Sequence, residues 1–224
     1  VNMSNEIHLK TIDEFCKSGD KFKILETHLK KYPAEYNSQS AIEAAFELRK
    51  DIQNIHGIQG INIFTFTAGY EIIADKEKWY PTNRETADHS LPYIVCAALL
   101  DGEITEKQFS MERISDPGLR ELVKKVNVYP NAGCDRDYYP GTPSIVEAVI
   151  ESGQKYSSKV VHPRGSYKNP MSDDELEEKF KALVGKYLTE TQIKDALRIV
   201  WNLEKEKDIS GLISTLVIAD SSVG

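Results

Sequence analysis

The residues best suited to chemistry stand together at the beginning of one segment, which runs from Arg84 to Gly102. An arginine, a histidine, a serine and a tyrosine lie within its first ten positions, at Arg84, His89, Ser90 and Tyr93. If a helix starts here, its unpaired backbone N–H groups and its macrodipole favour a negative charge at the same place. The segment therefore predicts a site that holds a carboxylate.

The same segment predicts the helix that positions these groups. Asp88 is a favourable N-cap and Pro92 is tolerated only in a first helical turn, so we expect the helix to begin within two residues of Asp88 and to stop at Gly102. Residues 94–100 are apolar on every side, which is typical of a helix inside a domain. A purely structural interpretation remains open, in which Asp88 and Ser90 only cap the helix, Arg84 pairs with a local acid and His89 is a hydrogen-bonded core histidine.

Composition limits the class of protein. The chain has 224 residues, of which 40% are hydrophobic and 9% aromatic, which suits one large or two small globular domains. A net charge of −7 argues against general binding of nucleic acid, which requires a basic face. No apolar run approaches the roughly 20 residues of a membrane span, and the first residues lack the features of a signal peptide. We expect a cytoplasmic protein with no membrane partner.

Cysteine and histidine residues give no sign of a metal centre. The three cysteines lie far apart without a CxxC pair, and the five histidines are equally scattered. Such sparse cysteines are typical of reduced thiols rather than of a disulfide framework or a zinc or iron–sulfur site. We expect no metal and no cofactor. The cysteines are Cys16, Cys96 and Cys134, and the histidines are His8, His28, His56, His89 and His162.

The remaining elements follow from periodicity and turn signals. A helix with an amphipathic stripe is expected from Ser40, with Glu43 completing a capping box. Alternating apolar residues predict a strand over residues 61–73, with a turn or bulge near Gly69. A short strand over 126–129 and a hairpin of strands over 145–150 and 155–161 follow, before three amphipathic helices of which the first two open with capping boxes.

This order predicts an α+β fold with segregated layers. We expect a small α/β domain over residues 57–165, with antiparallel strands and packed helices. Residues 1–56 are expected to form an N-terminal helical segment. Residues 166–224 are expected to form C-terminal helices that complete a helical part.

The string RETADHSLPY, followed by an apolar helix that ends in LLDG, resembles the MmgE/PrpD family. A second similarity is the run Lys30-Lys31-Tyr32-Pro33 before a helix, and by that match Lys30 corresponds to a lysine of the family's active site. The family often has a histidine shortly after this proline, where Glu35 and Tyr36 stand here. A strand that ends in His162-Pro163-Arg164-Gly165 is also similar, and we favour a turn-shaping role over substrate contact for His162 and Arg164.

The resemblance covers only the C-terminal half of the family, whose usual member is about twice as long. It implies a C-terminal fragment or a natural half protein, expected to act as a homodimer or with a separate N-terminal half. Its implied function is that of a metal-free hydro-lyase that converts 2-methylcitrate, a small tricarboxylate, into 2-methylaconitate in the methylcitrate cycle of propionate catabolism. Lys30 and His89 are then the expected catalytic residues, and Arg84, Ser90 and Tyr93 the expected substrate-binding residues.

Alternative functions remain open at this point. A cis-aconitate decarboxylase or an epimerase of the same family would use similar carboxylate recognition and proton transfer. A non-catalytic half-length subunit that needs an N-terminal partner is the alternative from a different class.

Overall fold

Helix α5 (Leu91–Asp101) lies at the buried centre of the first of two structural units. The computed structural model describes residues 22–218, which divide between Pro170 and Met171. Ser90 is the N-cap of α5, Pro92 lies in the first turn, and Gly102 ends the helix with a left-handed φ of 73°. Every residue from Leu91 to Leu99 is buried. The predicted end and burial of this helix are therefore confirmed. The predicted N-cap is wrong, because Ser90 caps α5 while Asp88 is the C-cap of the preceding short helix, α4 (Arg84–Ala87).

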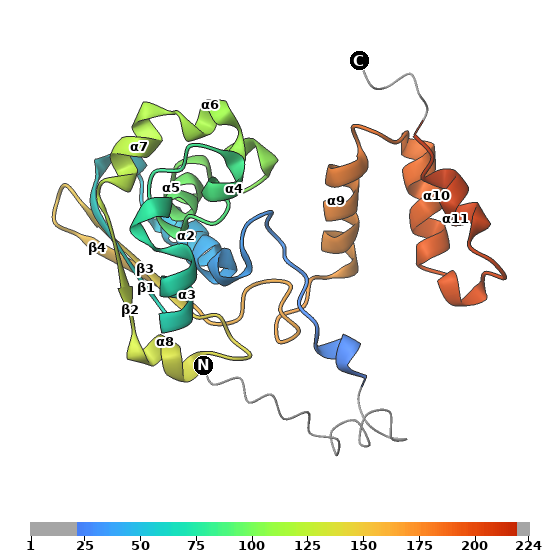
Figure 1. Cartoon of the computed structure of the whole chain (residues 1–224), viewed down its shortest axis with the longest axis horizontal. Helices are drawn as coiled ribbons and strands as arrows, with labels where there is room; N and C mark the ends of the chain where they lie inside the picture. The colour runs from blue at the N-terminus through green and yellow to red at the C-terminus, as the bar shows by residue number, and fades with distance from the viewer. Residues whose placement is uncertain (1–21, 219–224) are drawn as a thin grey trace. The chain divides into compact units, whose positions relative to one another are not determined.

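A four-stranded sheet with the order β2-β1-β3-β4 supports this helix (Figure 1). Strand β1 pairs in parallel with β2 and antiparallel with β3, and β3 pairs antiparallel with β4. The predicted α+β class is confirmed. The expectation of antiparallel strands is wrong for one pair, because the chain crosses back through α5 between β1 and β2 and so enters β2 in the direction of β1. The strands are β1 (Ile58–Thr65), β2 (Val126–Pro130), β3 (Ser144–Ile150) and β4 (Lys155–Val160).

Helix α2 (Gln39–Asp51) packs against β3, β4 and α5. Its buried face includes three alanines, which allow close approach to the sheet. The predicted capping box is wrong, because both of its side chains make tertiary contacts instead. The Ser40 hydroxyl donates to the backbone oxygen of Thr142, and Glu43 Oε1 accepts from the backbone N–H of Arg164 at 2.7 Å. The first unit also contains α3 (Thr67–Ile73), α4 (Arg84–Ala87), α6 (Met111–Ile114), α7 (Pro117–Val123) and α8 (Ala132–Asp137).

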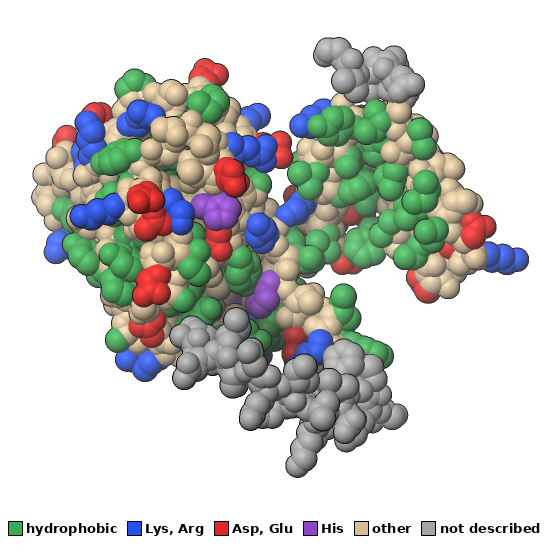
Figure 2. All heavy atoms as spheres, viewed as in Figure 1, with side chains coloured by type: hydrophobic (Ala, Val, Ile, Leu, Met, Phe, Trp, Pro, Cys, Tyr) green, Lys and Arg blue, Asp and Glu red, His purple; other side chains and the backbone are tan. Residues whose placement is uncertain are grey.

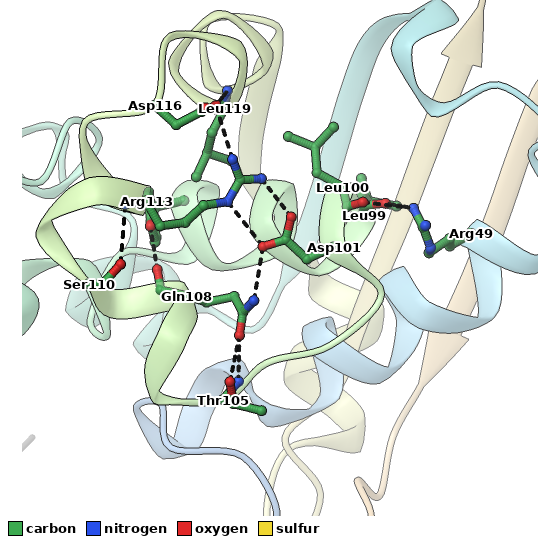
Figure 3. Close-up of polar contacts among 11 residues, drawn as sticks. Arg49, Leu99, Leu100, Asp101, Thr105, Gln108, Ser110, Arg113, Asp116 and Leu119 are labelled. Carbon is green, nitrogen blue, oxygen red and sulfur yellow. Dashed lines mark hydrogen bonds and ion pairs between the residues drawn. The ribbon is translucent and has the colours of Figure 1, made fainter.

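Polar contacts fix the C-terminal end of α5 (Figure 3). The Arg49 guanidinium donates to the backbone oxygens of Leu99 and Leu100, which satisfies carbonyl groups that a helix end leaves unpaired. The Asp101 carboxylate accepts from Arg113 Nη2 at 2.6 Å and from Arg113 Nε at 3.0 Å, a bidentate pair. The C-terminal end of the buried helix is thereby held to α2 through Arg49 and to α6 through Arg113.

The strand predicted over residues 61–73 is two elements, because β1 ends at Thr65 and α3 begins at Thr67. The Asp135 carboxylate of α8 accepts hydrogen bonds from the Thr67 N–H at 2.7 Å and from the Thr67 hydroxyl at 2.9 Å. Such a carboxylate at a helix start stabilises the helix. The cap comes from a distant part of the chain, so the local alternation of apolar residues was misleading.

The second unit consists of α9 (Asp173–Val184), α10 (Glu190–Val200) and α11 (Ser210–Thr215). The capping boxes predicted at Ser172 and Thr189 are confirmed. Within these three helices the buried residues are Ile193, Ala196 and Ile199, all on α10. Hydrophobic side chains cover much of the visible face of this unit (Figure 2). The exposed large ones include Leu183, Tyr187, Val200, Trp201, Ile209, Ile213 and Val217.

Across residues 22–218, none of the helices combines the length and the apolar character needed to span a membrane. His8 and Cys16 lie outside the described residues. Cys96 and Cys134 are buried free thiols.

Candidate functional site

Main-chain hydrogen bonds bring three distant segments together in the first unit. The segment of residues 27–38 lies beside the turn before α5, because the Glu35 N–H donates to the Asp88 oxygen at 2.9 Å. It also lies beside the turn after β4, because the Leu29 N–H donates to the Gly165 oxygen at 2.8 Å. The 27–38 segment therefore carries Lys30 toward the segment that carries His89.

The charges of Lys30 and His89 both act on the carboxyl of Glu35. Its Oε2 accepts from the Asn37 N–H at 2.6 Å, which caps a short 3₁₀ turn. Burial raises the pKa of the Glu35 carboxyl, and the Asn37 hydrogen bond and the positive charges of His89 and Lys30 oppose that rise. Lys30 and His89 thus act electrostatically on one half-buried carboxyl. The sequence showed Glu35 only as a departure from the family pattern.

His89 is oriented by two oxygen atoms. Its Nδ1 lies 2.5 Å from Asp88 Oδ1 and 3.1 Å from the Glu85 backbone oxygen. Both neighbours are acceptors, so we assign the proton of the neutral ring to Nδ1, which leaves the lone pair of Nε2 available. The side chain is exposed, so Nε2 of His89 is an accessible and oriented base. Histidine side chains reach the surface of this unit among acidic and basic groups (Figure 2).

Arg84 lies on α4, one turn before His89. Its Nη2 is 3.3 Å from Glu106 Oε1, and both side chains are about half exposed. Exposed pairs of this kind contribute little to stability. This pairing with a nearby acid agrees with the structural interpretation, and it leaves the guanidinium accessible to an anion from solvent.

Ser90 and Tyr93 are buried and do not share the surface of Lys30 and His89. The Ser90 hydroxyl accepts from the Tyr93 N–H at 3.4 Å, as the cap of α5. The Tyr93 hydroxyl donates to the Gln108 backbone oxygen at 2.5 Å, and burial raises its pKa. In this structure Ser90 therefore caps α5, and Tyr93 is a buried core residue that is bonded to the backbone of Gln108.

A second group of polar side chains, absent from the sequence-based predictions, lies on the same segment. The Tyr36 hydroxyl is 2.7 Å from His28 Nδ1, and the Tyr167 ring meets the His28 ring edge-on. Burial raises the pKa of Tyr36 to about 12. Burial lowers the pKa of His28, and the charge of His162 adds to that effect. The available signal was that His28 and Tyr36 flank the Lys30 motif at short range.

Arg164 shapes the turn after β4, as predicted. Its guanidinium Nη1 donates to Asn169 Oδ1 at 3.0 Å, and its N–H is bonded to Glu43. Within the described residues, no group of three or more histidine, cysteine or acidic side chains has the arrangement of a metal site.

Comparison with known proteins identifies the relatives of this chain. Residues 32–205 match the model of the MmgE/PrpD C-terminal domain. The cis-aconitate decarboxylase of Homo sapiens is 28% identical over 192 residues, which are 84% of this chain and 39% of that protein. The 2-methylcitrate dehydratase of Salmonella typhi is 30% identical over 173 residues, 72% of this chain and 35% of that protein. The 2-methylcitrate dehydratase of Escherichia coli K12 is 29% identical over 139 residues, 58% of this chain and 28% of that protein.

The chain thus spans about two-fifths or less of the length of these relatives. Decarboxylases and dehydratases are both lyases, so the similarity points to a family of lyases. The domain match covers most of the sequence and includes the Glu35 and His89 positions. This chain therefore belongs to the MmgE/PrpD family, and its residues 32–205 correspond to the C-terminal domain of that family.

Proposed function

We propose that this chain is the C-terminal part of a hydro-lyase that dehydrates 2-methylcitrate to 2-methylaconitate without a metal. The observation that supports this function is the hydrogen bond from the Glu35 N–H to the Asp88 oxygen, which brings the segment of Lys30 and Glu35 beside the Asp88-oriented His89. The names of two relatives add support, since both are 2-methylcitrate dehydratases.

Dehydration requires a base, an acid and fixed positive charge. In the proposed reaction His89 Nε2 takes the proton from the carbon beside a carboxylate. Electron density moves to that carboxylate, where Lys30 and Arg84 stabilise the added charge. The C–O bond then breaks, and the departing hydroxyl takes a proton from an acid and leaves as water. Glu35 suits the role of that acid, because burial favours its protonated form.

Decarboxylation of cis-aconitate is the second candidate function. The specific observation in its favour is that the human decarboxylase matches 84% of this chain, a larger share than either dehydratase matches. Here a C–C bond breaks, carbon dioxide leaves, and an acid protonates the carbanion. The same cations would bind the carboxylates of both substrates.

Substrate turnover tests both candidates. The purified chain is given 2-methylcitrate, citrate and cis-aconitate, alone and with an N-terminal half of a relative, while ultraviolet absorbance reports a new conjugated double bond and gas release reports decarboxylation. We expect dehydration of 2-methylcitrate.

Lys30→Ala should cost about 2–4 kcal/mol of transition-state stabilisation. Lys31→Ala is the matched control, and equal turnover by wild-type and Lys30→Ala protein would refute the role of Lys30.

The apolar surface of the second unit suggests the partner. We propose that α9–α11 are covered in a homodimer or by an N-terminal half, because exposed apolar patches of this kind mark interfaces. Ile213→Asp should then weaken association in sedimentation velocity runs over a range of concentrations. A wild-type monomer at every concentration would contradict the homodimer. We also propose a cytoplasmic location, which cell fractionation tests.

A further inference from the structure

Two buried polar atoms of the first unit have no hydrogen-bond partner among the described residues. They are Thr142 Oγ1 and His162 Nδ1. A buried polar atom without a partner costs free energy, so native structures rarely keep one without a reason. These two atoms are therefore the strongest sign of a ligand outside the Lys30, Glu35 and His89 group.

Both atoms belong to one cluster with His28 and Tyr36. The Thr142 N–H donates to the Val161 oxygen at 3.0 Å, so Thr142 lies opposite the residue that precedes His162. The Thr142 hydroxyl also acts on Tyr36, where it offsets part of the effect of burial on the tyrosine pKa. His162 acts electrostatically on His28, which contacts Tyr36.

This cluster adjoins the proposed catalytic residues. His28 and Tyr36 lie on the 27–38 segment, which also carries Lys30 and Glu35. The Leu29 N–H holds that segment to the Gly165 oxygen, three residues after His162. In the sequence, Lys30 stands between His28 and Tyr36, two members of the cluster.

The donor set fits a carboxylate. The threonine hydroxyl is a donor and an acceptor, and each imidazole becomes a double donor when it takes up a proton. We propose that His28, Tyr36, Thr142 and His162 form a second subsite, which binds another carboxylate arm of the tricarboxylate substrate. This subsite rests on the proposed function, because the first arm is assigned to Lys30.

The variant Thr142→Val tests the subsite, because we expect it to raise the stability of the protein and to weaken its binding of citrate. Valine keeps the shape and removes the unpartnered hydroxyl, so the melting temperature of the full 224-residue chain should rise by about 2–4 °C. Calorimetric titration with citrate as the probe should show about tenfold weaker binding, since one hydrogen bond to a charged group is lost. A buried water that pairs with this hydroxyl predicts the reverse, a lower melting temperature and unchanged citrate affinity, and would overturn the subsite.

Thr65→Val is the matched control. Thr65 is buried as Thr142 is, but its hydroxyl donates to the Pro143 oxygen at 3.4 Å and accepts from Ser144 Oγ at 3.4 Å. Its loss should lower the melting temperature and leave the citrate affinity unchanged. Equal effects of Thr65→Val and Thr142→Val on citrate binding would overturn the subsite.

Two further measurements separate this subsite from the proposed function. If Lys30→Ala abolishes citrate binding while Thr142→Val does not weaken it, the subsite is wrong and the role of Lys30 stands. In NMR spectra, citrate should shift the ring signals of His28 and His162 and raise the pKa of His28, because a bound carboxylate favours the imidazolium. His56, an exposed histidine just before β1, should not respond. Failure of His28 and His162 to respond would overturn the subsite.

Discussion

Helix α5 and helix α9 differ in how much of each is buried and in what stabilises them. Every residue of α5 from Leu91 to Leu99 is buried, whereas α9 has no buried residue. The polar contacts of α9 are a capping box at Ser172, an ion pair between Glu177 and Lys181 at 2.8 Å, and a hydrogen bond to Glu177 from the indole of Trp201, which follows α10. Short helices are marginal in water on local support alone. Burial therefore stabilises α5, whereas α9 depends on its cap, its surface ion pair and its contact with Trp201.

Truncation of one apolar side chain in each helix should give the largest contrast. Ile94→Ala removes a side chain with 0% exposure and should lower the free energy of unfolding by about 2–5 kcal/mol. Leu183→Ala, at 49% exposure on α9, should stay within about 0.5 kcal/mol. Urea titration followed by the fluorescence of Trp79 in the first unit and Trp201 in the second measures both.

Each variant is compared in a background that keeps only the tryptophan of its own unit. Equal losses for Ile94→Ala and Leu183→Ala would break the contrast, and would mean that α9 has a covered face in solution.

Replacement of the two capping serines, Ser90 and Ser172, should give a smaller difference in stability than the truncations of Ile94 and Leu183. Ser90→Ala leaves the buried Tyr93 N–H without its acceptor and should cost about 1–3 kcal/mol. Ser172→Ala exposes the Glu175 N–H to water, which can replace the hydroxyl, so we expect about 0.5–1 kcal/mol. Thermal unfolding measures both, and amide exchange at Tyr93 should accelerate only in Ser90→Ala. A larger loss for Ser172→Ala would reverse the comparison.

The smallest effect on stability is expected from Glu35 in the candidate site, as a dependence of the free energy of unfolding on pH. Burial raises the pKa of Glu35 above its ordinary value of 4.5, so folding favours the protonated carboxyl. The resulting stability is fully present below the unfolded pKa and is lost as the pH rises through the folded pKa. Wild-type protein should therefore lose stability relative to Glu35→Gln as the pH rises above 4.5.

Urea titrations at several pH values measure this difference. Glu112→Gln, at an exposed position on α6, is the control and should run parallel to wild type. Parallel curves for Glu35→Gln would show that burial does not perturb this carboxyl.

Local signals predicted the fold wherever the stabilising groups are local. Pro92 and Gly102 indicated the first turn and the end of α5 correctly, whereas the N-cap is Ser90 and not the predicted Asp88. The end of β1 was missed because the carboxylate that caps α3 belongs to Asp135. The parallel pairing of β2 was missed because direction depends on the crossover and not on the residues of the strand.

The candidate site was predictable only in part, for the same reason. The resemblance pointed to Lys30 and His89, and their shared neighbour Glu35 emerged from a hydrogen bond between distant main-chain atoms. The direction of Tyr93 was not predictable, because a helix that is apolar all round carries no periodicity to indicate its facing side. The partner of Tyr93 is the backbone oxygen of Gln108, which offers no side-chain signal.

The 27–38 segment is tied to its neighbours by main-chain groups, at Leu29 and Glu35. Backbone hydrogen bonds do not depend on side-chain identity, so residues on this segment can be exchanged while its position is kept. New chemistry can then be acquired by point substitution, without redesign of the scaffold.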